Sequence, residues 1–359
     1  MARNPHYDPS LPHHRPGGFQ NVEVPFEPKT LGEVLRWRWD AARQRLPHPP
    51  RTPIPQQAPD LDFIHRNATA GGAMRPAVTW IGHATALMQC SGVNVLTDPI
   101  FSHRASPLRF AGPQRHQPPG LALRELPRID LVLVSHNHYD HLDDASARAL
   151  HTQPGGPPQF VVPLGLKAWF AARGIRSVVE LDWWQTHSLR GPKGPVDVVL
   201  VPAQHWSARG LGDRMATLWG GFAVFGPDCH WFYAGDTAYS REFSRMRESF
   251  ALRQSGAQGG GFDLALLPIG SYEPRWFMAG QHVNVEEALQ IHRDLGAKRS
   301  LGVHWGTFAL TDEPLDEPPQ RLARLGLAQG LAEDEFFVLP IGGTQRLAAR
   351  DATRDAKML

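Results

Sequence analysis

The sequence has few of the features that mark secreted, membrane-spanning or nucleic-acid-binding chains. Its 359 residues include two cysteines, Cys90 and Cys229, too few for a disulfide framework or a thiolate zinc cluster. It has no apolar run of about 18 residues and no N-terminal stretch that could serve as a signal-peptide core. Because 37 Lys and Arg stand against 35 Asp and Glu, the net charge of +2 gives no general attraction to nucleic acid. We therefore expect a globular, cytoplasmic protein without a nucleic-acid partner.

Histidine, by contrast, is abundant, with 18 residues. The informative stretch is IDLVLVSHNHYDHLDD at 129–144, where an apolar strand-like run ends in a polar loop. This loop carries four side chains of the kind that bind metals: His136, His138, Asp140 and His141. In an extended segment, residues two apart face the same way, so His136 and His138 can both bind one ion. Asp140 and His141 can then turn toward a second ion.

Three further candidate ligands each close a short apolar run later in the chain. His205 follows VLVP, Asp236 follows WFYAG, and His304 follows SLGV. A single His or Asp after a strand is usually a turn or cap residue. Their shared context, however, favours side chains that project from strand ends into one cleft. The set therefore predicts a site for two metal ions.

Longer motifs around these residues carry a specific resemblance. The string SHNHYDHLD, preceded by TWIGHATALM and LTDPIFSHRASP, is followed by AQHW, AGDTAY, PIGSYEPRWFM, QHVNVEEA and HWGTFAL. In this order, over roughly residues 75–340, the chain resembles the metallo-β-lactamase superfamily. More narrowly, it is similar to the N-acyl-phosphatidylethanolamine-hydrolysing phospholipase D family. The stretch SARGLGDRM after AQHW matches no family motif, which leaves the acyl-chain and membrane preference open.

The resemblance implies an α+β fold, the four-layer αββα sandwich of the metallo-β-lactamase fold, with two divalent metal ions at one edge. It implies seven ligands, namely His136, His138 and His205 for the first ion, Asp140, His141 and His304 for the second, and Asp236 as the bridge. Zinc is the usual metal of the family, and iron or manganese also suits a His and Asp set. Asp98 and His83, both near strand ends, are expected in a second shell, where a carboxylate orients a metal-bound histidine. A plain turn role for Asp98, ahead of Pro99, is an equal alternative.

The activity implied by the resemblance is phospholipase D-type hydrolysis of N-acyl-phosphatidylethanolamine to N-acylethanolamine and phosphatidic acid. A hydroxide that bridges the two metal ions, with Asp236 holding them, would attack the phosphodiester. Tyr139 and His282 match family positions that contact the substrate, and His282 could also protonate the leaving group. A purely structural role for His282 remains open. The alternative function is hydrolysis of another substrate, such as a lactone or a sugar phosphate, on the same fold.

The chain is expected to divide into an N-terminal arm (1–71), a catalytic domain (72–345) and a C-terminal tail (346–359). The arm is rich in proline and arginine, and its histidines, His6, His13, His14 and His48, are expected to lie on its surface. One amphipathic helix is predicted over 31–46. Its apolar stripe consists of Leu31, Val34, Leu35, Trp39, Ala42 and Leu46. Packing of this stripe on the catalytic domain is favoured over peripheral membrane contact, and family resemblance suggests a homodimer.

Overall fold

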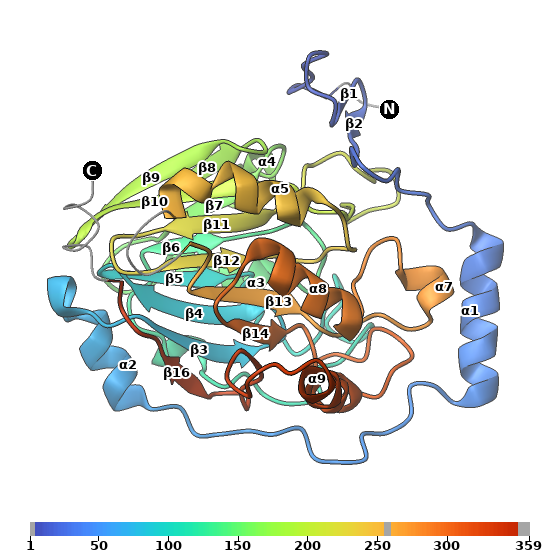
Figure 1. Ribbon diagram of the computed structural model, residues 1–359. Helices are drawn as coiled ribbons and strands as arrows, with labels where there is room; N and C mark the ends of the chain where they lie inside the picture. The colour runs from blue at the N-terminus through green and yellow to red at the C-terminus, as the bar shows by residue number, and fades with distance from the viewer. Residues whose placement is uncertain (1–3, 255–259, 351–359) are drawn as a thin grey trace.

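The computed structural model describes residues 4–254 and 260–350 and shows two facing seven-stranded sheets (Figure 1). In spatial order, the first sheet comprises β16 (Thr344–Arg346), β3 (Ala77–Gly82), β4 (Thr85–Cys90), β5 (Val93–Thr97), β6 (Leu131–Leu133), β7 (Gln159–Pro163) and β8 (Val178–Leu181). The second comprises β15 (Phe336–Phe337), β14 (Ser300–Val303), β13 (Leu264–Pro268), β12 (His230–Tyr233), β11 (Gly221–Phe225), β10 (Gly194–Val201) and β9 (Thr186–Gly191). In each sheet, antiparallel strands occupy one half and parallel strands the other.

Helices cover the outer face of each sheet and complete four layers. Over the first sheet lie α2 (Leu61–Ala68), α3 (Asp144–His151) and α4 (Lys167–Ala171). Over the second lie α5 (Glu242–Ser249), α8 (Val285–Leu295) and α9 (Glu317–Ala328). The remaining short elements are β1 (His14–Arg15), β2 (Gly18–Phe19), α6 (Ala251–Gln254), α7 (Arg275–Met278) and the 3-10 turns at Gly71–Ala73 and Leu123–Glu125. This arrangement confirms the predicted αββα sandwich.

Strand β6 shows why the predicted apolar run folds as a central strand. Leu131 and Leu133 point into the core between the two sheets, whereas Val132 and Val134 pack in the cluster beneath the helices. Because both faces of the strand are covered, an uninterrupted apolar run replaces the usual alternation of apolar and polar residues. The run ends where the chain leaves the sheet, and the polar loop that follows is held at the sheet edge.

The N-terminal arm is held more firmly than a surface extension would be. The predicted surface position of two of its histidines is wrong: His13 and His14 are buried, with Nε2 atoms 2.7 and 3.0 Å from the two carboxylate oxygens of Asp182. The backbone N–H of Asp8 donates to Nδ1 of His14, so the Nε2 proton of His14 is available for Asp182. These contacts fasten β1 and β2 to the loop after β8. Residues 346–350 of the predicted tail pack against the body, whereas 351–359 lie outside the described residues, and both domain boundaries remain predictions.

The helix α1 (Leu31–Gln44) stands beside α7 at the side of the molecule (Figure 1). The expectation that its apolar stripe packs on the domain is wrong, because Leu31, Leu35 and Trp39 are 74, 60 and 67% exposed. The helix instead contacts the body through Trp37, whose ring lies 4.7 Å from that of Phe277. In the sequence, Trp37 lies between Arg36 and Arg38, so the apolar pattern of the helix does not mark it as a contact residue. Among the described residues, no helix is long and apolar enough to cross a membrane.

Candidate metal centre

The candidate ligands converge because several strands end at the same edge of the sandwich. Strands β12, β13 and β14 are parallel, and two antiparallel pairings bring β10 into the same direction. The loops after β10, β12 and β14 therefore meet at one edge, and they carry His205, Asp236 and His304. The loop after β6 in the facing sheet contributes the four remaining predicted ligands. All seven sequence-predicted metal ligands are thus brought together.

Three histidines form the first group, and their ring nitrogens point at one another. Nδ1 of His138 lies 2.8 Å from Nε2 of His136 and 3.3 Å from Nε2 of His205. Nδ1 of His205 donates to the carbonyl oxygen of Gln281 at 2.8 Å, so the inward Nε2 of the neutral ring carries a lone pair. Nδ1 of His136 likewise faces the hydroxyl of Ser135 at 2.9 Å. Lone pairs that converge in this way suit a cation between them.

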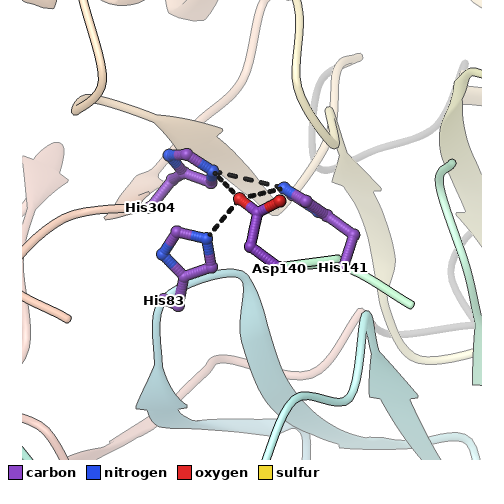
Figure 2. A group of neighbouring side chains, drawn as sticks. All are labelled: His83, Asp140, His141 and His304. Atoms are coloured by element: carbon purple, nitrogen blue, oxygen red, sulfur yellow. Dashed lines mark hydrogen bonds and ion pairs between the residues drawn. The ribbon is translucent and has the colours of Figure 1, made fainter. Parts of the chain in front are cut away.

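The second group gathers Asp140, His141 and His304 (Figure 2). The Nε2 atoms of the two histidines are 3.2 Å apart, and each lies 3.3 Å from Oδ2 of Asp140. His83 is the fourth member of this group and contacts the same carboxylate oxygen at 2.9 Å (Figure 2). His83 was predicted in the second shell. Its position is compatible either with that role or with direct ligation.

Asp236 lies between the two groups. Its carboxylate oxygens are 3.1 Å from Nε2 of His141 and 3.2 Å from Nε2 of His304. Oδ2 is also 3.8 Å from the Nε2 atoms of His136 and His205. Oδ1 is buried and has no hydrogen-bond partner among the described residues. A carboxylate in this position is suited to bridge two cations.

The electrostatics of the centre also favour cations. Burial lowers the pKa of His205 to about 4 and that of His136 and His138 well below the usual range, although Asp236 opposes this. These rings are therefore neutral at neutral pH, as ligation requires. At His141, burial is outweighed by the carboxylates of Asp236 and Asp140, which raise its pKa well above the usual range. The excess negative charge there is what a divalent ion would neutralise, so both groups fit metal ions.

Asp98 lies behind the ligands, fully buried. Its carboxylate accepts hydrogen bonds from Nδ1 of His141 at 2.6 Å, from the backbone N–H of Ser135 at 2.7 Å and from the hydroxyl of Tyr233. The hydroxyl of Ser135 also donates to it at 2.5 Å. Because Nδ1 of His141 donates its proton to Asp98, Nε2 is left to face the second group. This is the arrangement expected of an orienting carboxylate, and the role itself remains a prediction.

The two predicted substrate residues differ in how they are held. The Tyr139 hydroxyl donates to the carbonyl oxygen of Arg209 at 2.9 Å, and the guanidinium of Arg209 lies 4.0 Å from the Tyr139 ring centre. His282 faces the centre, with Nδ1 3.9 Å from Asp236 and without a hydrogen-bond partner among the described residues. Burial lowers the pKa of His282 to about 3, against the opposing effect of Asp236. At neutral pH this ring can donate an N–H but carries no positive charge.

Two residues that support the centre, Asn21 and Arg209, were not predicted from the sequence. Asn21, from the arm, is buried and pairs with the backbone of His205: its amide donates to the carbonyl at 2.9 Å and accepts from the N–H at 3.3 Å. Arg209 donates to the carbonyl oxygens of Asn137 and Leu142 at 2.8 and 2.6 Å, which braces the loop after β6. No periodicity or motif marks these positions, because both contacts depend on the tertiary fold.

Comparison with known proteins agrees with this geometry. Residues 93–305 match the beta-lactamase superfamily domain. The chain is 41% identical over 268 residues to N-acyl-phosphatidylethanolamine-hydrolyzing phospholipase D 1 of Caenorhabditis elegans, which covers 72% of each chain. It is 40% identical over 339 residues to an uncharacterized protein of Mycobacterium tuberculosis, covering 92% of this chain and 83% of that one. A solved isothiocyanate hydrolase from Delia radicum gut bacteria superposes with a TM-score of 0.58 at 20% identity, over 76% of this chain and all of the other.

The fold and the site therefore define a metal-dependent hydrolase of the beta-lactamase superfamily. The structural match, at 20% identity, supports the fold alone. The sequence match to the Caenorhabditis elegans protein is more specific than this structural match, because it reaches 41% identity over 72% of the chain. Within the superfamily, the chain belongs to the N-acyl-phosphatidylethanolamine-hydrolysing phospholipase D family.

Proposed function

We propose that this protein hydrolyses N-acyl-phosphatidylethanolamine to N-acylethanolamine and phosphatidic acid, with zinc as its metal. The observation that carries the proposal is the convergence of the seven candidate ligands, in two groups with Asp236 between them, in a chain 41% identical to a relative named for this activity. Two divalent ions held there would supply Lewis acidity toward phosphate oxygens and activate water near neutral pH. Neutral imidazole and carboxylate ligands are of types that zinc accepts.

The reaction is a transfer of the phosphatidyl group to water. The water oxygen bonds to phosphorus while the bond between phosphorus and the N-acylethanolamine oxygen breaks. One water proton is lost, and the leaving oxygen takes up a proton. His282 is placed to donate its N–H to the leaving oxygen or to the phosphate, and its low pKa favours a neutral donor over a charged acid. Tyr139, with its hydroxyl bonded to Arg209, would contact the substrate through its ring edge or after exchange of that bond.

The exposed face of α1 supports a peripheral membrane contact during this reaction. Leu31, Leu35 and Trp39 are more than half exposed there, and Trp276 on α7 is 42% exposed nearby. Arg36, stacked 5.0 Å from the Trp276 ring, adds positive charge at this surface. Apolar side chains beside arginines suit the boundary between lipid headgroups and acyl chains. A homodimer remains a prediction without a structural observation of its own.

The substrate assignment is tested with purified, metal-loaded protein and lipids in water enriched in oxygen-18. The proposed chemistry releases N-acylethanolamine and places the label in phosphatidic acid, because water attacks phosphorus. The Asp236→Asn variant should release neither product above background. Parallel assays with a lactone and a sugar phosphate test the alternative. Metal-loaded protein that turns over one of these, but releases no acylethanolamine, would reject the lipid assignment.

A further inference from the structure

A cavity of about 410 Å³ lies between α1, α7 and the beginning of α9, and none of the candidate metal ligands lines it. Its walls come from the N-terminal arm on one side and from the catalytic domain on the other. Five carboxylates line this space, which we call the acidic cavity: Asp40, Glu273, Asp312, Glu313 and Glu317. None of these residues belongs to either ligand group. The volume is that of a site for a small organic molecule.

Among the residues that line the cavity, Arg321 is the one cation beside five carboxylates, although Arg38 also acts on Asp312 and Arg324 on Glu317. Arg321 lines the cavity, but its guanidinium donates twice to Glu286, at 3.1 and 2.8 Å, and is 3.7 Å from Glu317. Arg36 lies 3.7 Å from Asp40 in an exposed pair. The second carboxylate oxygen of Glu317 is buried and has no hydrogen-bond partner among the described residues. An additional positive charge would therefore be favourable in the cavity.

Burial of these carboxylates has a measurable electrostatic cost. It raises the pKa of Asp312 and of Glu317, although Trp37 opposes the shift at Asp312 and Arg321 opposes it at Glu317. It also raises the pKa of Glu313 to about 7, despite backbone N–H groups that donate to its carboxylate. A bound cation would offset this cost.

Aromatic side chains form the rest of the walls. Trp37, Tyr272 and Trp276 line the cavity, and Trp37 donates its indole N–H to Asp312 at 2.9 Å. The side chain of Tyr272 is fully buried, and its hydroxyl has no hydrogen-bond partner among the described residues. Each of these rings already has an arginine near it: Arg36 lies 5.0 Å from the centre of the Trp276 ring, Arg38 5.3 Å from that of Trp37 and Arg321 5.4 Å from that of Tyr272. These rings therefore attract cations in this protein. Aromatic faces combined with carboxylates suit organic ammonium groups. They suit bare metal ions less well, because such ions differ from ammonium groups in size and softness.

We propose that the acidic cavity binds an organic ammonium group, held between Trp37 and Asp312 on one side and Tyr272 and Glu317 on the other. Such a ligand would connect α1 to the catalytic domain. The ammonium group can belong to a free amine or to the headgroup of a phospholipid. Both sources share the chemistry that the cavity recognises. This binding is independent of the hydrolysed substrate.

Binding is tested by calorimetric titration of the metal-loaded full chain with tetramethylammonium chloride, against sodium chloride at the same concentration. We expect saturable binding of about one tetramethylammonium per chain and none for sodium. Asp312→Asn keeps an acceptor for Trp37 but removes the charge, and Glu317→Gln does the same for Arg321. Each should weaken binding about fivefold or more. Glu333→Gln, an exposed carboxylate away from the cavity, is the matched control and should bind as the wild type does.

A second titration separates the two sources of the ligand. If a lipid headgroup is recognised, phosphatidylcholine vesicles should displace tetramethylammonium from the wild type, and vesicles of phosphatidylglycerol should not. If a free amine is recognised, neither vesicle displaces it and choline chloride does. Both results support the cavity assignment. Binding that does not saturate, equal heats with sodium, or equal weakening by Glu333→Gln would overturn it.

Discussion

Asp98 shows how one buried carboxylate can set the direction of several neighbours. It accepts from Nδ1 of His141 and from Ser135, whose hydroxyl in turn faces Nδ1 of His136. We therefore propose that one histidine from each candidate group is oriented through the same carboxylate. Without it, His141 and His136 would retain their positions in sequence but lose the proton arrangement that leaves their Nε2 atoms free.

Replacement of Asp98 by Asn tests this role. The amide is the same size but can donate as well as accept, so it no longer fixes the tautomer of His141. We expect metal affinity to fall about 10- to 100-fold. Competition with a chromophoric chelator measures this. Asp62→Asn, an exposed carboxylate on α2, is the control, and an unchanged affinity for Asp98→Asn would assign Asp98 to a plain turn role.

Asp236 should have a larger effect because its carboxylate oxygens lie within 3.8 Å of candidate ligand nitrogens of both groups. We expect Asp236→Asn to lower kcat by roughly 1000-fold or more and to reduce the bound metal from about two ions to about one per chain. Elemental analysis and turnover assays measure the two effects. Two tightly bound ions and normal turnover in this variant would remove Asp236 from the bridge.

At the scale of elements, the N-terminal arm is part of the support of the metal centre. Asn21 holds the backbone of His205, and the contacts of His13 and His14 with Asp182 fasten the segment before it. A further contact between the arm and the loop that carries His205 is made by the rings of Phe26 and Trp206, whose centres are 5.4 Å apart. The arm thus contacts the main chain of one candidate ligand, His205, and we propose that it positions this residue.

We therefore expect Asn21→Ala to weaken metal binding about 10-fold, since it removes two hydrogen bonds from a buried ligand loop. Asp182→Ala should have a smaller effect on metal affinity but make the segment around His13 and His14 more accessible to a protease of broad specificity, because the buried histidine contacts are lost. Chelator competition and limited proteolysis measure the two variants. Gln20→Ala, beside Asn21 but without a contact to the ligand loop, is the control. Equal metal affinity in all three variants would assign the arm a role in stability alone.

How far the elements could be predicted depends on whether their signal is local. The apolar run of β6 and the motif after it carry their own pattern, which predicts the strand and the metal-binding loop. The sandwich and the assignment of ligands to two groups were predicted from the family resemblance of the longer motifs. Strand β9 is largely exposed and carries no such run, so its place at the sheet edge depends on pairing with β10. In α1, the contact residue Trp37 sits between Arg36 and Arg38, and only the packed structure shows which face turns inward. The contacts of Asn21 and Arg209 are invisible for the same reason.

For the whole molecule, the candidate metal ligands come from both sheets, and we propose that bound ions join them. His136, His138, Asp140 and His141 follow a strand of the first sheet, and the other predicted ligands follow strands of the second. Because the ions bind only the folded arrangement, their removal should lower stability by about 4 kcal/mol at a free metal concentration 1000 times the Kd. For a chain of this size, we expect chelation to lower the Tm by roughly 5 °C or more. Calorimetry with restored zinc as the control measures this, and an unchanged Tm would contradict a role of the ions in joining the sheets.

The exposed side of α1 sets how the whole molecule would meet a lipid surface. Leu35 and Trp39 lie outside the contact made by Trp37, so their replacement by Ser removes apolar area without disturbing the body. Full burial of one large apolar side chain contributes about 1.5–3 kcal/mol, so the double variant, which loses two of them, should bind vesicles roughly 100-fold more weakly or worse. Hydrolysis of a soluble phosphodiester should stay the same, because the metal centre is untouched. Leu327→Ser, an exposed leucine on α9, is the matched control for vesicle co-sedimentation. If it weakens binding as much as the α1 variant, the exposed side of α1 is not the surface that meets the membrane.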